Sequence, residues 1–165
     1  HQMLGDTARL QQASRRATFS KAIADIKADF VALEGTVTAD EPAAETEKLE
    51  GKGLYAPAAE VMSAWADVES LCQRLLEKNG VHVPGPYRAL GSRLKRNQLI
   101  DPEHAAILDK LRQIRNIAAH GGPDIVSACE AREYIALAGR MMTYLNRQLG
   151  AEWTKERKEM DQSGG

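Results

Sequence analysis

The stretch DPEHAAILDKLRQIRNIAAHGGP, residues 101–123, contains the start, the body and the end of one amphipathic helix. Asp101 is a favourable N-cap, Pro102 fits the first helical position, and Glu103 suits the positive end of the helix dipole. The run of two glycines and a proline that follows His120 cannot continue a helix, so we expect the helix to end near His120. Its inward face is an apolar arc of Leu108, Leu111, Ile114 and Ala118.

Apolar residues spaced three and four positions apart predict further helices on both sides of this stretch. Before it, they cover residues 6–33, 57–78 and 87–98. After it, Ser127 and Glu130 have the spacing of a capping box, and the apolar positions of the helix that follows continue to Leu149. No strand pattern is present in the sequence. We therefore predict an all-α protein, an antiparallel four-helix bundle with an additional long N-terminal helix.

By composition the chain divides into four segments. Residues 1–35 are expected to form an N-terminal helical arm, residues 36–55 an acidic linker, residues 56–150 the helical bundle, and residues 151–165 a C-terminal tail. The arm has an apolar seam about two heptads long, which can pack either on the bundle or on another copy of the chain. The seam consists of Phe19, Ile23, Ile26, Phe30 and Leu33.

Charge and composition limit the classes of partner. The net charge of −1 over 165 residues gives no global signature of nucleic-acid binding. Between Arg74 and His120, however, the sequence contains nine lysines and arginines but only four acidic residues. This local excess of positive charge suits a polyanionic partner. No apolar run is long enough to span a membrane. Cys72 and Cys129 lack CxxC spacing, which favours small buried thiols in a reducing, cytoplasmic compartment.

Two opposite charges are expected on core-facing sides of helices. Arg115 falls on the apolar arc between Leu108 and Leu111, and Glu69 falls on the inward face of the helix at 57–78. Burying either charge alone is costly, so we expect the two side chains to meet. The pair is either a structural ion pair or a guanidinium held for phosphate, with Glu69 fixing its orientation.

His120 lies in the last helical turn, where the negative helix end favours its protonated form. It can serve as a general acid or base, or it can simply cap the helix. Residues five apart on a helix differ by about 140°, so Arg115 and His120 do not share a face. They converge if the helix unwinds, if a cleft wraps its end, or if a two-fold partner contributes a second pair. The sequence contains no His/Cys cluster and no phosphate-binding glycine loop, so we expect neither a metal nor a cofactor, and His104 is interpreted as a satisfied core histidine.

The segment from Leu111 to Gly121 resembles the signature of the HEPN superfamily. That signature is an arginine, often a polar residue, three further residues and a histidine at the end of a bundle helix, and Arg115, Asn116 and His120 occupy these positions. Residues 65–69 also resemble the first core helix of many members, in which an acidic residue approaches the arginine. The resemblance covers roughly residues 57–149, whereas the arm and the acidic linker have no counterpart in the minimal family pattern.

The resemblance implies a fold and two possible functions. Many members are metal-independent endoribonucleases, often toxins of toxin–antitoxin or phage-defence systems, and they act as dimers whose two motifs face one cleft. Others are non-catalytic modules that bind RNA, nucleotides or proteins. We expect the first function, with RNA cleaved through its 2′-hydroxyl by a homodimer, and with an antitoxin or other protein as a further partner. The alternative is a non-catalytic module that binds RNA, nucleotides or proteins, in which the N-terminal arm pairs with a partner or anchors a larger assembly.

The residues expected to act fall into two groups. The catalytic group is Arg115, His120, Asn116 and Glu69, and the substrate-binding group is Arg112, Lys110, Arg93 and Arg96.

Overall fold

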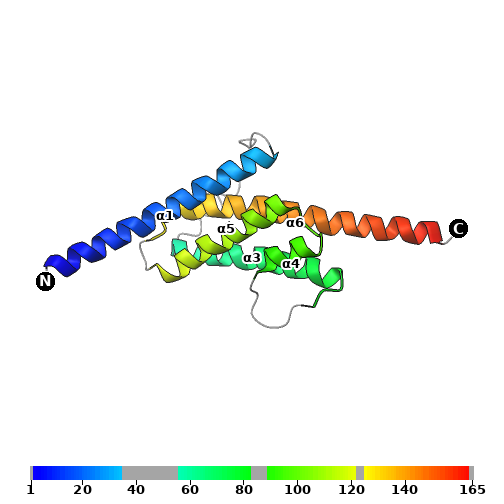
Figure 1. The fold of residues 1–165 in the computed structure, drawn as a ribbon, viewed down its shortest axis with the longest axis horizontal. Helices are drawn as coiled ribbons and strands as arrows, with labels where there is room; N and C mark the ends of the chain where they lie inside the picture. The colour runs from blue at the N-terminus through cyan, green and yellow to red at the C-terminus, as the bar shows by residue number, and fades with distance from the viewer. Residues whose placement is uncertain (1, 35–55, 83–88, 122–124, 164–165) are drawn as a thin grey trace.

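The computed structural model describes residues 2–34, 56–82, 89–121 and 125–163; for residues 2–4 and 151–163 it describes the backbone alone. Within these ranges the chain forms five helices and no strand, which confirms the predicted all-α class (Figure 1). The helices are α1 (Gln2–Glu34), α3 (Pro57–Lys78), α4 (Leu90–Arg96), α5 (Pro102–His120) and α6 (Ala128–Ser163). The linker predicted over 36–55 lies outside the described residues. None of the described helices is long and apolar enough to cross a membrane.

The predicted helix caps are present at α5 and α6. The Asp101 carboxylate accepts a hydrogen bond from the backbone N–H of His104 at 2.7 Å, which satisfies one of the free donors at the start of α5. At the start of α6, the N–H of Glu130 donates to the Ser127 hydroxyl at 3.1 Å, and the N–H of Ser127 donates back to the Glu130 carboxylate at 3.3 Å. This reciprocal pair is the expected capping box.

Helix α6 is longer than the apolar pattern indicated. It passes through Gly150 and continues to Ser163, so most of the segment expected as a C-terminal tail is helical. A single glycine costs a helix interior only about 1 kcal/mol, and the following residues 151–162 contain neither proline nor glycine. Helix α4 is shorter than predicted at its C-terminal end, where Gln98 has a positive φ of 57°.

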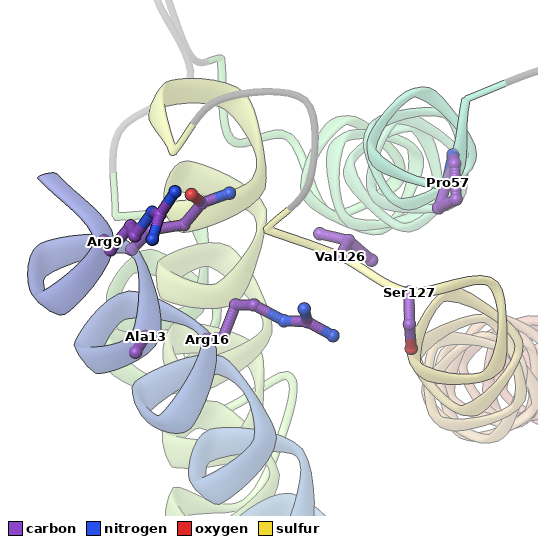
Figure 2. A pocket seen from close by; sticks show the side chains of 7 residues that line it. Arg9, Ala13, Arg16, Pro57, Val126 and Ser127 are labelled. Atoms are coloured by element: carbon purple, nitrogen blue, oxygen red, sulfur yellow. The ribbon is translucent and has the colours of Figure 1, made fainter. Parts of the chain in front are cut away.

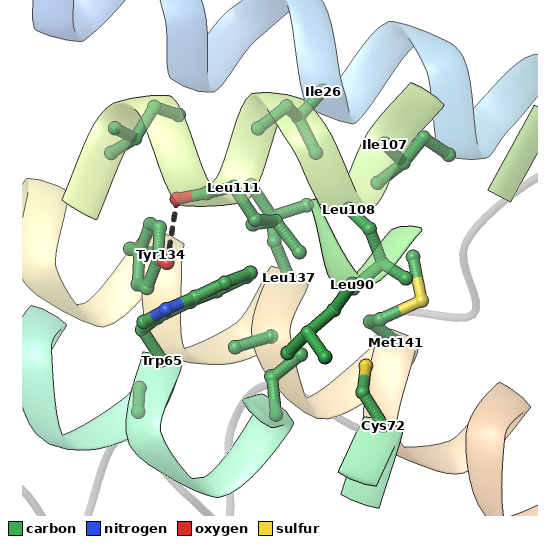
Figure 3. Close-up of a cluster of buried hydrophobic side chains, with 14 of the residues drawn as sticks. Ile26, Trp65, Cys72, Leu90, Ile107, Leu108, Leu111, Tyr134, Leu137 and Met141 are labelled. Carbon is green, nitrogen blue, oxygen red and sulfur yellow. Dashed lines mark hydrogen bonds between the residues drawn. The ribbon is translucent and has the colours of Figure 1, made fainter. Parts of the chain in front are cut away.

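The core forms around α5, which packs against α1, α3, α4 and α6 (Figure 3). The predicted seam of α1 packs on this bundle: its first four apolar residues are buried, while Leu33 at its end is 38% exposed. The seam is therefore occupied within the chain and does not face a second copy. The four buried residues are Phe19, Ile23, Ile26 and Phe30. Of the two cysteines, Cys72 is buried as expected, but Cys129 is exposed on the first turn of α6.

The directions of the helices differ from a purely antiparallel bundle. The Lys78 ammonium at the end of α3 donates a hydrogen bond to the Leu149 carbonyl of α6. Each of these residues lies 21 positions after the first residue of its helix, so α3 and α6 run parallel and in register. Helix α5 runs against both, because the chain reverses once before α5 and once after it (Figure 1). As a result, the N-terminal ends of α3 and α6 and the C-terminal end of α5 lie at the same end of the bundle (Figure 1).

Candidate functional site

The C-terminal end of α5 is fixed by close packing of the chain that follows it. Gly121 ends the helix in a right-handed conformation, with φ −88°, so a left-handed turn is not the reason for a glycine here. A Cβ atom at this position would lie 2.1 Å from Ile125 Cδ1 and 2.7 Å from the Ile117 carbonyl oxygen. Glycine is therefore favoured because a Cβ here would clash with the backbone oxygen of Ile117, and also with the side chain of Ile125, which is fully buried against the end of the helix.

The guanidinium of Arg115 is held by its neighbour in the sequence. Arg115 is half-buried, and its Nη1 donates to the Asn116 side-chain oxygen at 3.1 Å. The expected direct contact with Glu69 is not made, and that carboxylate instead accepts the indole N–H of Trp65 at 2.8 Å. Among the described residues, no carboxylate forms an ion pair with Arg115.

Arg115 and Glu69 nevertheless act on the same buried group. Tyr134 of α6 is completely buried, and its hydroxyl donates to the Leu111 carbonyl at 2.9 Å (Figure 3). Burial raises the pKa of this phenol well above its ordinary range, while Arg115 lowers it and Glu69 raises it. Arg115 of α5 and Glu69 of α3 therefore both influence Tyr134, although the two side chains form no ion pair with one another.

The exposed face of α5 is a polar stripe made by Asp109, Gln113, Asn116 and His120. At 100° per residue these positions fall within about 60° of one another. Asn116 is half-buried and His120 is exposed, and they are one turn apart on this stripe. Because Asn116 binds the guanidinium, it draws the Arg115 side chain toward the face that contains His120.

The four predicted substrate-binding residues are not gathered at this end. Arg112 pairs with Asp109 at 2.8 Å, and Lys110 pairs with Asp29 of α1. Arg93 and Arg96 belong to α4, and a Cβ atom added to Gly91 of α4 would meet Ala105 and Leu108. Leu108 and Ala105 precede His120 by 12 and 15 residues, so α4 contacts α5 about 20 Å from His120 along the axis of α5.

An open cleft of about 550 Å³ lies at the end of α5 where α3 and α6 begin. One wall is a face of α1 with Arg9, Gln12, Ala13 and Arg16, and the facing wall consists of Pro57, Val126 and Ser127 (Figure 2). The sequence analysis did not identify the α1 wall of this cleft. The spacing of three, four and seven residues between its members is visible in the sequence, but the tertiary fold decides which residues face them.

A second polar cluster joins α1, α5 and α6 at the opposite end of α5. His104 is 6% exposed, stacks on Tyr144 with ring centroids 3.5 Å apart, and places Nδ1 2.7 Å from the Asp101 carboxylate. Its Nε2 is buried without a hydrogen-bond partner and lies 3.7 Å from the Glu34 carboxylate, which also pairs with Arg140 at 2.8 Å. The expected satisfied histidine is thus satisfied at one nitrogen only.

Within the residues that the structure describes, no group of three or more histidine, cysteine, aspartate or glutamate side chains is placed to hold a metal ion. Comparison of the chain with protein-family models, with curated proteins and with solved structures gave no match.

Proposed function

We propose that this chain is a metal-independent endoribonuclease of the HEPN type, in the manner of a toxin or phage-defence effector, whose active site is formed at the C-terminal end of α5. The observation that supports this proposal best is the hydrogen bond from Arg115 to Asn116. It holds a guanidinium that has no carboxylate partner among the described residues near the face on which His120 is exposed. A guanidinium that forms no ion pair in the described residues and an exposed imidazole near the same helix end are the kinds of group that phosphodiester cleavage needs.

The proposed reaction is an attack by the ribose 2′-oxygen on the adjacent phosphorus. His120 accepts the proton of the 2′-hydroxyl, or donates a proton to the departing 5′-oxygen, and water exchanges the other proton. Arg115 stabilises the charge on the phosphorane. The P–O5′ bond breaks, which leaves a 2′,3′-cyclic phosphate on one fragment and a 5′-hydroxyl on the other. Asn116 is a positioning residue for the guanidinium, whereas Glu69 accepts the Trp65 indole N–H and does not contact Arg115.

The test is cleavage of RNA in the presence of EDTA. We expect the wild-type protein to cut RNA to cyclic-phosphate ends, and His120→Ala to lower the rate at least about a hundredfold, as loss of a general base does. His82→Ala is the matched control, because His82 is an exposed histidine beyond the other end of α3. Full activity of His120→Ala, or equal loss in both variants, would contradict the role given to His120.

The alternative, a non-catalytic module that pairs through the seam of α1, has lost the feature that motivated it, because the seam is buried in the bundle. What remains of it is a non-catalytic module that binds RNA, nucleotides or a protein through another surface. Stoichiometric RNA binding by a wild-type protein that leaves unmodified RNA intact would favour that function.

A further inference from the structure

We propose that the cleft between α1 and the N-terminal ends of α3 and α6 binds the phosphate backbone of RNA through Arg9 and Arg16. The inference rests on RNA being the substrate, as proposed above. It assigns substrate binding to the arm, outside the α5 motif and outside the residues that the sequence indicated.

The first reason is the arrangement of the two cations. Arg9 and Arg16 are seven residues apart, or about two helical turns and 10 Å along α1, so their side chains leave the same face of the helix. Both line the cleft, with Gln12 and Ala13 between them (Figure 2). A guanidinium binds phosphate through paired N–H donors, and a row of two suits consecutive groups of one strand.

The second reason is that these two cations form no ion pair in the described residues, whereas several cations elsewhere in the bundle do. Lys27 pairs with Glu133, Lys110 with Asp29 and Arg140 with Glu34. In the part of the chain that the structure describes, neither Arg9 nor Arg16 forms an ion pair.

Glu130, a carboxylate close to the facing wall, makes hydrogen bonds to neutral donors and forms no ion pair with either arginine. Glu130 accepts hydrogen bonds from the Ser20 hydroxyl at 2.8 Å and from the Ser127 N–H at 3.3 Å. The two arginines are therefore available to an anion from outside the chain.

The third reason is position. Ile125 packs directly on Gly121 at the end of α5, and Val126 and Ser127, the next two residues, form the facing wall of the cleft. The cleft is open rather than enclosed, so it suits a strand that passes through it better than a small anion that must be surrounded. A strand held there runs beside the helix end that contains His120.

The test is the affinity for an oligoribonucleotide with 2′-O-methyl groups, which cannot be cleaved through its 2′-oxygen, measured by fluorescence anisotropy at several salt concentrations. Loss of two phosphate contacts lowers the slope of log affinity against log salt by about 1.4 for a single strand. We therefore expect Arg9→Gln/Arg16→Gln to bind about 25-fold more weakly at about 0.1 M salt, with the difference vanishing near 1 M. Glutamine is a good helix former and both positions are exposed, so the variant should keep its helical circular dichroism.

Two controls separate the site from general charge. Arg15→Gln/Arg74→Gln removes the same charge from exposed positions that do not line the cleft, and it should bind like the wild type. Ala13→Glu places a carboxylate in the cleft and should weaken binding, whereas Ala17→Glu, one turn further along and outside the lining, should not.

Each outcome decides the proposal. Weaker binding by the cleft variants alone supports it, and equal effects of cleft and control variants overturn it. A wild type that does not bind RNA also overturns it. The ribonuclease function is judged separately by cleavage of unmodified RNA, so a protein that binds through Arg9 and Arg16 without cutting would refute only the activity.

Discussion

Asn116 determines where the guanidinium of Arg115 lies, and the sequence pattern indicated a different partner. Helical periodicity placed Glu69 and Arg115 on core-facing sides, and in the structure both are half-buried and both influence Tyr134. Periodicity does not determine which hydrogen-bond donor a carboxylate on that face will bind. The indole N–H of Trp65 needs an acceptor when it is buried, and Glu69 one turn later on the same helix supplies it. The arginine then takes the adjacent amide oxygen.

The role of Asn116 can be separated from that of the residues around it. In Asn116→Ala the guanidinium loses its acceptor, and we expect kcat for RNA cleavage to fall about a hundredfold while KM changes little, because misplacement of a catalytic group costs rate rather than binding. Gln113→Ala is the control, since Gln113 is exposed on the same stripe one turn earlier and bonds only to Asp109. A normal kcat in Asn116→Ala would show that Arg115 does not depend on this contact.

At the scale of the helices, local sequence signals predicted where the helices begin and end better than they predicted which helices pack against one another. The bounds of α3, the Asp101 cap and the Ser127–Glu130 capping box depend on residues close in sequence, and all are present. The partner of the α1 seam and the location of Arg93 and Arg96 depend on how the chain reverses between α3 and α6. Because α4 packs on the N-terminal half of α5, its arginines lie away from His120, and a face of α1 lies at that end instead.

The start of α5 should show a pH-dependent contribution to stability. Burial alone would raise the pKa of Asp101, but hydrogen bonds from the His104 N–H, the Tyr144 hydroxyl and the His104 ring, together with the charge of His104, hold the pKa below its ordinary value. A carboxyl group whose folded-state pKa is lowered stabilises the fold above its unfolded pKa, near 3.9, and this contribution is lost as pH falls through the lower folded-state value.

We therefore expect Asp101→Ala to lower the free energy of unfolding by about 1–2 kcal/mol at pH 7, measured by urea denaturation, and the difference from wild type to narrow below about pH 4. Asp101→Asn keeps an N-cap acceptor without the charge, so it should lose less stability, and its loss at neutral pH should again diminish in acid. A loss in Asp101→Ala that is equal at all pH values would contradict the electrostatic part of this account.

On the scale of the whole molecule, the core leaves little of α5 uncovered. Helices α1, α3, α4 and α6 all pack on it, and the first part of α1 and the last part of α6 extend beyond the core at opposite ends (Figure 1). The surface of α5 that remains for a second copy of the chain is its polar stripe and its C-terminal end. This is also the surface that contains Asn116 and His120, so a dimer formed there would bring two motifs together.

Our last prediction is that the active enzyme is such a homodimer, with Arg115 of one chain acting alongside His120 of its partner. In the described residues no hydrogen bond joins these two side chains within one chain, and their positions on α5 differ by about 140°. A two-fold axis near the helix end would supply both groups to each of two sites. Chains with Arg115→Ala should therefore regain cleavage when they are mixed and exchanged with His120→Ala chains, to about a quarter of the wild-type rate for random pairing.

The matching control is an exchange of wild-type chains with the Arg115→Ala/His120→Ala double variant, under the same conditions and with exchange verified by a tag on one chain. If the sites are shared between chains, these mixed dimers contain no intact pair and are inactive. If each chain contains a complete site, the mixed dimers keep one active site, while the two single variants never complement each other. Normal cleavage by a chain that sedimentation shows to be monomeric at the assay concentration would be incompatible with the shared site.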